Sequence, residues 1–150
     1  SMENHINYVL LLVNQRLYLI NQLRKQGLSA KAREVVFHSL VISRLLYALP
    51  AFVGFLSGAD IARFNSVFRK SVRWGIIDRM FDFDELSISS QDQLFKRFST
   101  NFNHCLHQLL PELRNTCYML RQRGHSFSLP VVSRTLFKKS FVVNYLYSHM

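Results

Sequence analysis

Residues 17–74 read LYLINQLRKQGLSAKAREVVFHSLVISRLLYALPAFVGFLSGADIARFNSVFRKSVRW, and this stretch decides the fold. Apolar residues recur in it at three- and four-residue steps, which place their side chains on one face of an α-helix. Turn-forming sequences at residues 26–29 and 55–58 divide the stretch into three such patterns. We therefore predict an all-α fold that begins with three packed helices, at about residues 4–26, 30–49 and 58–75.

The ends of these helices have recognisable signals. Gly27 suits the turn after the first helix, because glycine adopts a positive φ at little cost. Ser29 is the predicted N-cap of the second helix, and Ser57 with Asp60 predicts a capping box for the third. Pro50 should end or kink the second helix. That helix is apolar on nearly all sides, so we expect it to lie centrally.

The second half of the chain has weaker patterns. Residues 78–90 read as a connector, and a fourth helix is expected at about residues 89–110, capped by Ser89 or Ser90 and stopped by Pro111. Residues 134–147 fit a short helix or a strand equally well. We therefore predict two regions: a helical bundle at residues 1–77 and a C-terminal segment at residues 78–150, with an irregular basic tail from residue 118.

The charge is strongly positive and unevenly placed. The chain carries 19 Lys and Arg against 9 Asp and Glu, a formal net charge of +10. Five of the acids fall within one window, at Asp78, Asp82, Asp84, Glu85 and Asp92. The basic regions on either side favour association with phosphates or another polyanion through counterion release. The simpler interpretation is that the charge serves solubility alone.

The third predicted helix is the most clearly amphipathic. At 100° per residue its Arg and Lys side chains lie opposite its Phe side chains, so its polar face is cationic. Such faces suit phosphate contacts that follow the backbone of a nucleic acid, although any single cation is as well explained as a solvated group. The residues predicted to bind nucleic acid are Arg16, Arg24, Lys25, Lys31, Arg33, Arg63, Arg69, Lys70, Arg73, Arg121 and Arg123.

Two clusters contain residue types that can carry chemistry. Asp82, Asp84 and Glu85 offer carboxylates for metal-dependent phosphoryl transfer, but acids just before a helix more often stabilise its N-terminus. Cysteine and histidine gather further on, yet their spacing fits no standard zinc module; they are His104, Cys105, His107, Cys117 and His125. We therefore predict no catalytic residue, no metal and no cofactor.

Two cysteines are too few for a disulfide framework, which indicates a reducing compartment inside the cell, the nucleus or the cytoplasm. No run of about 18 uncharged apolar residues is present, so no membrane partner is expected. Attachment of the cationic helices to a membrane surface ranks last among the alternatives, because their apolar faces are better explained as a shared core.

Two segments resemble a known family. Residues 15–29 (QRLYLINQLRKQGLS) are similar to the pattern xRLYxLxxLRxxGL, and residues 37–52 (FHSLVISRLLYALPAF) to YxxLVxSxLxYxxPxW, with Phe52 where Trp is common. Both patterns belong to the segment that follows the palm in reverse transcriptases of non-LTR (LINE-type) retrotransposons. The likeness continues in order through most of the chain, although each motif alone is loose.

The resemblance implies a thumb-like three-helix bundle followed by a post-thumb extension. In that family the thumb grips the template–primer duplex, so the expected partners are RNA, DNA or an RNA–DNA hybrid, and the rest of the parent polymerase. The catalytic aspartates of the palm have no counterpart here, since residues 83–85 (FDE) do not match the family's turn. The chain alone is thus not expected to be an enzyme. A helical protein-interaction module is the alternative, motivated by the apolar surface of residues 35–56.

Overall fold

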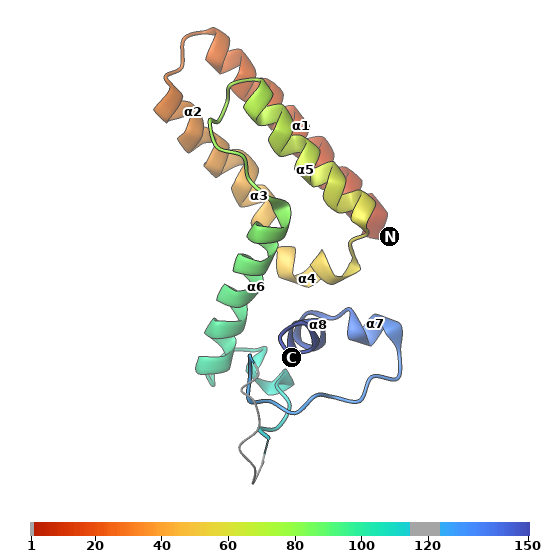
Figure 1. Ribbon diagram of the computed structural model, residues 1–150. Helices are drawn as coiled ribbons and strands as arrows, with labels where there is room; N and C mark the ends of the chain where they lie inside the picture. Colours follow the sequence, from red (N-terminus) through yellow and green to blue (C-terminus); the bar gives the residue numbers. More distant parts are fainter. Residues whose placement is uncertain (1, 115–123) are drawn as a thin grey trace. The chain divides into compact units, whose positions relative to one another are not determined.

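The computed structural model describes residues 2–114 and 124–150, which form helices joined by turns (Figure 1). The all-α prediction is confirmed; in these residues the only β-type pairing is an isolated antiparallel bridge between Leu113 and Phe127. The chain divides into two compact units. The first comprises Ser1–Leu49 and Leu56–Ile88, and the second Pro50–Phe55 and Ser89–Met150.

Two long helices run side by side in the first unit. They are α1 (Met2–Lys25) and α5 (Gly58–Arg73), and they are parallel, so that both C-termini lie at the same end (Figure 1). Their buried residues follow the predicted three- and four-residue spacing. On α1 these are Ile6, Val9, Leu10, Val13, Leu17 and Ile20, and on α5 Phe64, Val67, Phe68 and Ser71.

The predicted helix ends are confirmed at three positions. Gly27 has a φ of +95°, and the amides of Gly27 and Leu28 donate to the carbonyls of Arg24 (3.0 Å) and Leu23 (3.1 Å), a Schellman motif. The Ser29 hydroxyl accepts from the Ala32 amide at 3.4 Å and caps the second helix.

Ser57 and Asp60 form the predicted capping box of α5. The Asp60 amide donates to the Ser57 hydroxyl at 3.2 Å, and the Ser57 amide donates to the Asp60 carboxylate at 3.1 Å. Hydrogen bonds from the Ser57 hydroxyl and amide lower the pKa of Asp60 below its ordinary value. The box therefore contributes stability above pH 4, and this contribution is lost as the pH falls.

The second predicted helix contains a π-helical turn and ends at Leu46, which corrects the predicted range of about residues 30–49. It consists of α2 (Ala30–Phe37), a π-helical turn η1 (His38–Ile42) and α3 (Ser43–Leu46). The guanidinium of Arg16 donates to the Leu40 carbonyl of the π turn at 2.5 Å. The helical path ends before Pro50, at Tyr47 and Ala48, where Ala48 has a φ of +56°. Pro50 then lies in the first turn of α4 (Leu49–Phe52), where its missing amide hydrogen costs little.

The first unit extends further along the chain than the predicted boundary at residue 77, because the predicted connector supplies core residues. Phe81 stacks on Phe37 with ring centroids 6.0 Å apart, and Phe83 stacks on Phe64 at 4.5 Å. All four rings are buried. The compact unit therefore ends at Ile88.

The fourth helix, α6 (Phe83–Thr100), begins and ends earlier than the predicted 89–110. Its start is set by side chains rather than by Ser89 or Ser90. Asn65 accepts the Phe83 amide at 2.9 Å, and Asp82 accepts the Asp84 amide at 3.1 Å. After Thr100 the Asn101 side chain accepts the Asn103 amide at 3.0 Å, a local bond that competes with helix continuation.

Residues 30–55 together are long and apolar enough to cross a membrane, judged by length and composition alone. In the structure 39% of the most apolar window is buried. The core helix of a soluble protein passes the same test, and here the helical path is interrupted at Tyr47 and Ala48. This segment is therefore weak evidence for a membrane span.

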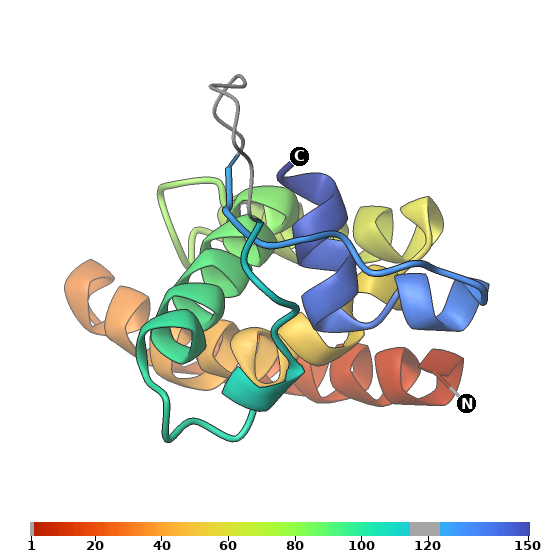
Figure 2. The same cartoon turned by 90° about the horizontal axis from the view of Figure 1, so that it is seen from below.

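The second unit packs short helices around part of α6. They are η2 (Val53–Phe55), η3 (His107–Leu109), α7 (Thr135–Lys138) and α8 (Phe141–Ser148). The core centres on Phe98, Val142 and Leu146. Residues 124–134 run past α8 to reach α7 (Figure 2). The tail predicted from residue 118 is thus not irregular throughout, because apolar side chains of α8 pack against Phe98 of α6.

A cluster of polar side chains lies at the C-terminal end of α8. The Tyr145 hydroxyl donates to the Asp92 carboxylate at 2.8 Å, and Nε2 of His149 lies 3.5 Å from the same carboxylate. Burial, followed by the hydrogen bond to Asp92, raises the pKa of Tyr145 to about 12 from its ordinary 10.0. The neutral phenol thus stabilises the folded chain below pH 10, and this contribution is lost as the pH rises towards 12.

Replacing Tyr145 by Phe should change the alkaline stability of the chain. Tyr145→Phe loses one hydrogen bond and about 1 kcal/mol at neutral pH, but it should lose less stability than the wild type between about pH 10 and 12. Melting temperatures measured from pH 8 to 12 test this. Tyr147→Phe, which also removes one hydroxyl, keeps Tyr145 and should follow the wild-type alkaline loss. Parallel curves for the wild type and Tyr145→Phe would contradict the assignment.

Gly54 provides a second test of the fold. A Cβ atom there would overlap the Lys139 carbonyl and lie 3.2 Å from the Asn144 side chain, so η2 can approach the turn before α8 only with glycine. Gly54→Ala should lower the free energy of unfolding by about 1–3 kcal/mol, the usual cost of overpacking. Gly58→Ala is the control, since a Cβ atom there meets nothing within 4 Å. Urea unfolding measures both, and equal stability of the two variants would refute the close approach.

Candidate functional site

The cationic face predicted for the third helix exists on α5. Arg69 and Arg73 lie on the side away from the buried Phe64 and Phe68. Arg63 and Lys70 lie at the border of the buried face, where they reach side chains of α1.

Two cations of α5 are held by asparagines of α1. The Arg63 guanidinium donates to the Asn7 carbonyl oxygen at 2.6 Å, and the Lys70 ammonium donates to that of Asn14 at 3.0 Å. Both pairs span the same 56 residues of sequence, so the parallel helices repeat one contact after seven residues. Seven residues rise about 10 Å along a helix, so the pairs Asn7–Arg63 and Asn14–Lys70 are spaced by about this distance. We call these two hydrogen-bonded pairs the rungs. Because amides are neutral, they position the charges without cancelling them.

A shallow hollow of about 380 Å³ lies beside the second rung. Lys70, Ser66, Arg69 and Arg73 line it. The Lys70 ammonium is also 4.5 Å from the centre of the Trp74 ring, a cation–π contact that further restricts its position. Three cationic side chains around one hollow make a favourable environment for an anionic group such as a phosphate.

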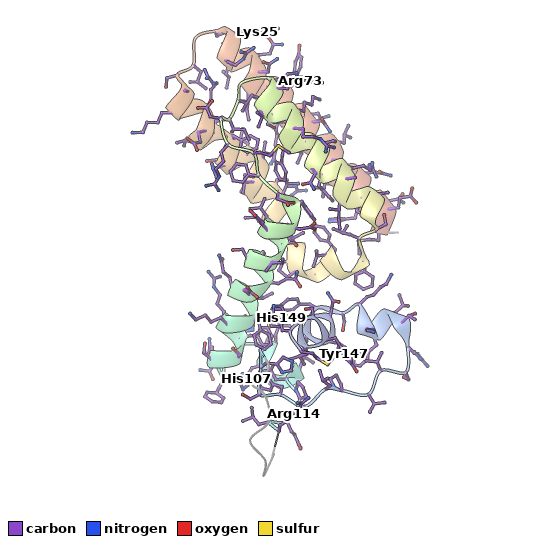
Figure 3. All side chains as sticks on the ribbon, viewed as in Figure 1. Lys25, Arg73, His107, Arg114, Tyr147 and His149 are labelled. Atoms are coloured by element: carbon purple, nitrogen blue, oxygen red, sulfur yellow. The ribbon has the colours of Figure 1, made fainter. Side chains whose placement is uncertain are left out.

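More cations gather where α1 and α5 end. Lys25 and Arg73 lie at the same end of this helix pair (Figure 3). Arg24 donates from Nε to the Asn21 side chain at 3.2 Å, again a neutral partner. Basic side chains in a last turn also stabilise the helix macrodipole, so these residues have a structural role beside any binding role.

Carboxylates neutralise little of this charge. Within residues 2–114 and 124–150, the only Lys or Arg that forms an ion pair with a carboxylate is Arg63, whose guanidinium is 3.5 Å from Asp60. The Arg63 side chain is 46% exposed, and exposed pairs of this kind contribute little. The cationic face of α5 therefore remains available to an external anion.

The other predicted cations are placed differently. Arg16 bonds the Leu40 carbonyl, and Arg33 donates to the Leu28 carbonyl at 2.8 Å with its Nε buried, so both guanidinium groups serve the fold. Lys31 is exposed in the first turn of α2. Arg121 and Arg123 lie outside the described residues.

The asparagines were not among the residues predicted from the sequence. Asn7, Asn14 and Asn21 repeat every seven residues on α1, and each accepts a hydrogen bond from a cationic side chain. Their seven-residue repeat is the pattern in the sequence from which these contacts could have been predicted. Arg44 was not among the predicted residues either; its guanidinium lies 5.7 Å and 5.9 Å from the ring centres of Tyr8 and Tyr47.

The clusters considered for chemistry have structural partners. Asp82 and Asp84 lie at the start of α6, where the amide bond to Asp82 is a capping contact. His125 uses both ring nitrogens, because Nδ1 accepts the Phe127 amide at 3.2 Å and Nε2 contacts the Leu146 carbonyl at 2.8 Å. In the part of the chain that the structure describes, no three potential metal ligands come together.

Comparisons with family models, curated proteins and solved structures found no match to this chain.

Proposed function

We propose that the chain binds nucleic acid through phosphate contacts made by α5 and by the adjoining ends of α1 and α2. The supporting observation is the pair of rungs, in which neutral asparagines hold Arg63 and Lys70 at fixed positions. A cation that is already positioned loses less side-chain entropy on binding than a free one. Contacts of this kind read the phosphate backbone and not the base sequence.

The sequence resemblance makes this proposal more specific. The chain would be the thumb and post-thumb segment of an RNA-directed DNA polymerase of the non-LTR retrotransposon type, and its ligand a template–primer duplex. It would hold the duplex without catalysing the reaction, while the catalytic aspartates would come from the palm of the parent polymerase. The chain would then act in the nucleus or the cytoplasm.

A second candidate function rests on the outer face of α1. Tyr8, Leu11, Tyr18 and Leu19 are each 52–57% exposed and lie opposite the buried face of that helix. A helical protein-interaction module would use such a face. Sedimentation over a wide concentration range tests self-association through it. A strict monomer at high concentration would count against an exposed docking face between copies, and Leu11→Glu should abolish any association that does occur.

The proposed nucleic-acid site can be tested without removing a cation. In Asn7→Asp with Asn14→Asp, an oxygen that accepts the hydrogen bond remains, but the neutral amide becomes a carboxylate that faces Arg63 or Lys70. We expect the affinity for an RNA–DNA hybrid to fall about tenfold or more at low salt, and the slope of log K against log salt to decrease by about two, because two phosphate contacts are replaced. Fluorescence anisotropy at several salt concentrations measures both quantities.

The control makes the same change in charge elsewhere. Asn103→Asp with Gln108→Glu adds two carboxylates at exposed positions of the second unit, which contains neither rung. This variant should keep a slope close to that of the wild type. If both double variants reduced the affinity and the slope equally, net charge alone would explain binding and the rungs would have no special part.

A further inference from the structure

The second unit contains an apolar hollow of about 530 Å³. This is within the range of cavities that hold small ligands. Side chains from several elements of the unit converge on it, among them Phe55, Leu94, Leu106, Phe137, Val143 and Leu146.

The described residues that line the hollow offer no free hydrogen-bonding side chain. Among them only Ser140 has a polar side chain, and its hydroxyl donates to the Phe137 carbonyl at 2.7 Å. A polar group placed inside would therefore lose its hydrogen bonds to water without replacement, at a cost of about 1–3 kcal/mol or more. The part of a ligand that enters the hollow must be hydrocarbon.

A cationic hollow of about 340 Å³ adjoins the apolar one. Arg134, Lys138 and Tyr147 line it together with Ser133 and Thr135. The linings of the two hollows are in contact, because the Tyr147 hydroxyl of the cationic hollow donates at 2.9 Å to the carbonyl of Pro130, which lines the apolar hollow. Phe137 of α7 lines the apolar hollow and the next residue, Lys138, lines the cationic one.

The two cations lack acidic partners. Among the residues that the structure describes, no carboxylate forms an ion pair with Arg134 or Lys138. The Lys138 ammonium instead lies 5.3 Å from the centre of the Tyr147 ring. An anionic group on a ligand would complement both charges at the edge of the apolar hollow.

We propose that the second unit binds an anionic amphiphile that has one hydrocarbon chain and one carboxylate. The chain occupies the apolar hollow, and the carboxylate lies against Arg134 and Lys138. The apolar lining selects the chain and the cationic rim selects the sign of the head group. This binding is separate from the phosphate contacts of α5.

Isothermal titration calorimetry of the whole chain tests the proposal with three ten-carbon probes below their micelle concentrations. Decanoate should bind one to one. Decyltrimethylammonium, with the same chain and a positive head, should bind at least about tenfold more weakly, and decanol should lie between them. Equal affinities for the three probes, or no saturable binding of decanoate, would overturn the proposal.

Matched variants locate the head group and the chain. Lys138→Glu should weaken decanoate binding about tenfold, whereas Lys139→Glu, the same change at a residue that lines neither hollow, should alter it by less than about threefold. Equal losses in the two variants would refute the head-group site. Ala51→Trp places a large ring in the apolar hollow from an exposed lining position and should abolish binding.

The wild-type chain gives a test that does not depend on how Ala51→Trp folds. Decanoate should shift the methyl NMR signals of Leu106, Val143 and Leu146, which line the hollow. Shifts confined to methyl groups elsewhere in the chain would overturn the assignment.

Discussion

The parallel packing of α1 on α5 is the constraint on which the candidate site depends. Burial of Val13, Leu17, Phe64 and Phe68 holds the two helices together, and the common 56-residue offset brings each asparagine to a cation. Two aspartates at the same positions would have made the pairing stronger but would have cancelled the charge. The amide oxygens position Arg63 and Lys70 without removing their charge.

Local sequence signals predicted the parts of the fold that local contacts determine. The Schellman turn at Gly27 and the capping box at Ser57 depend on residues at most five positions apart, so both could be identified from the sequence. The start of α6 could not, because it depends on Asn65 and on the stacking of Phe83 against Phe64, about 20 residues away. The π turn likewise depends on a bond from Arg16 of α1, which no local pattern encodes.

For the candidate site, too, local patterns could be predicted from the sequence and tertiary contacts could not. Amphipathic spacing identified the cations of α5, because the helix period separates all four from the buried Phe64 and Phe68. In the sequence, Arg16 and Arg33 look equivalent to the cations of α5. In the structure their guanidinium groups donate to the backbone carbonyls of Leu40 and Leu28. Which cations serve the fold and which face solvent is decided by tertiary contacts. The asparagine rungs follow from the helix register, which the sequence alone does not fix.

We propose that positioned cations on α5, of which only Arg63 pairs with a carboxylate among the described residues, bind a phosphate backbone. The most direct measurement is the affinity of the unmodified chain for an RNA–DNA hybrid between about 50 and 200 mM salt. We expect measurable binding at low salt and a linear fall of log K with log salt, with a slope steeper than about −2, since at least three phosphate contacts are expected. Binding that does not change with salt, or no binding at the lowest salt, would contradict it.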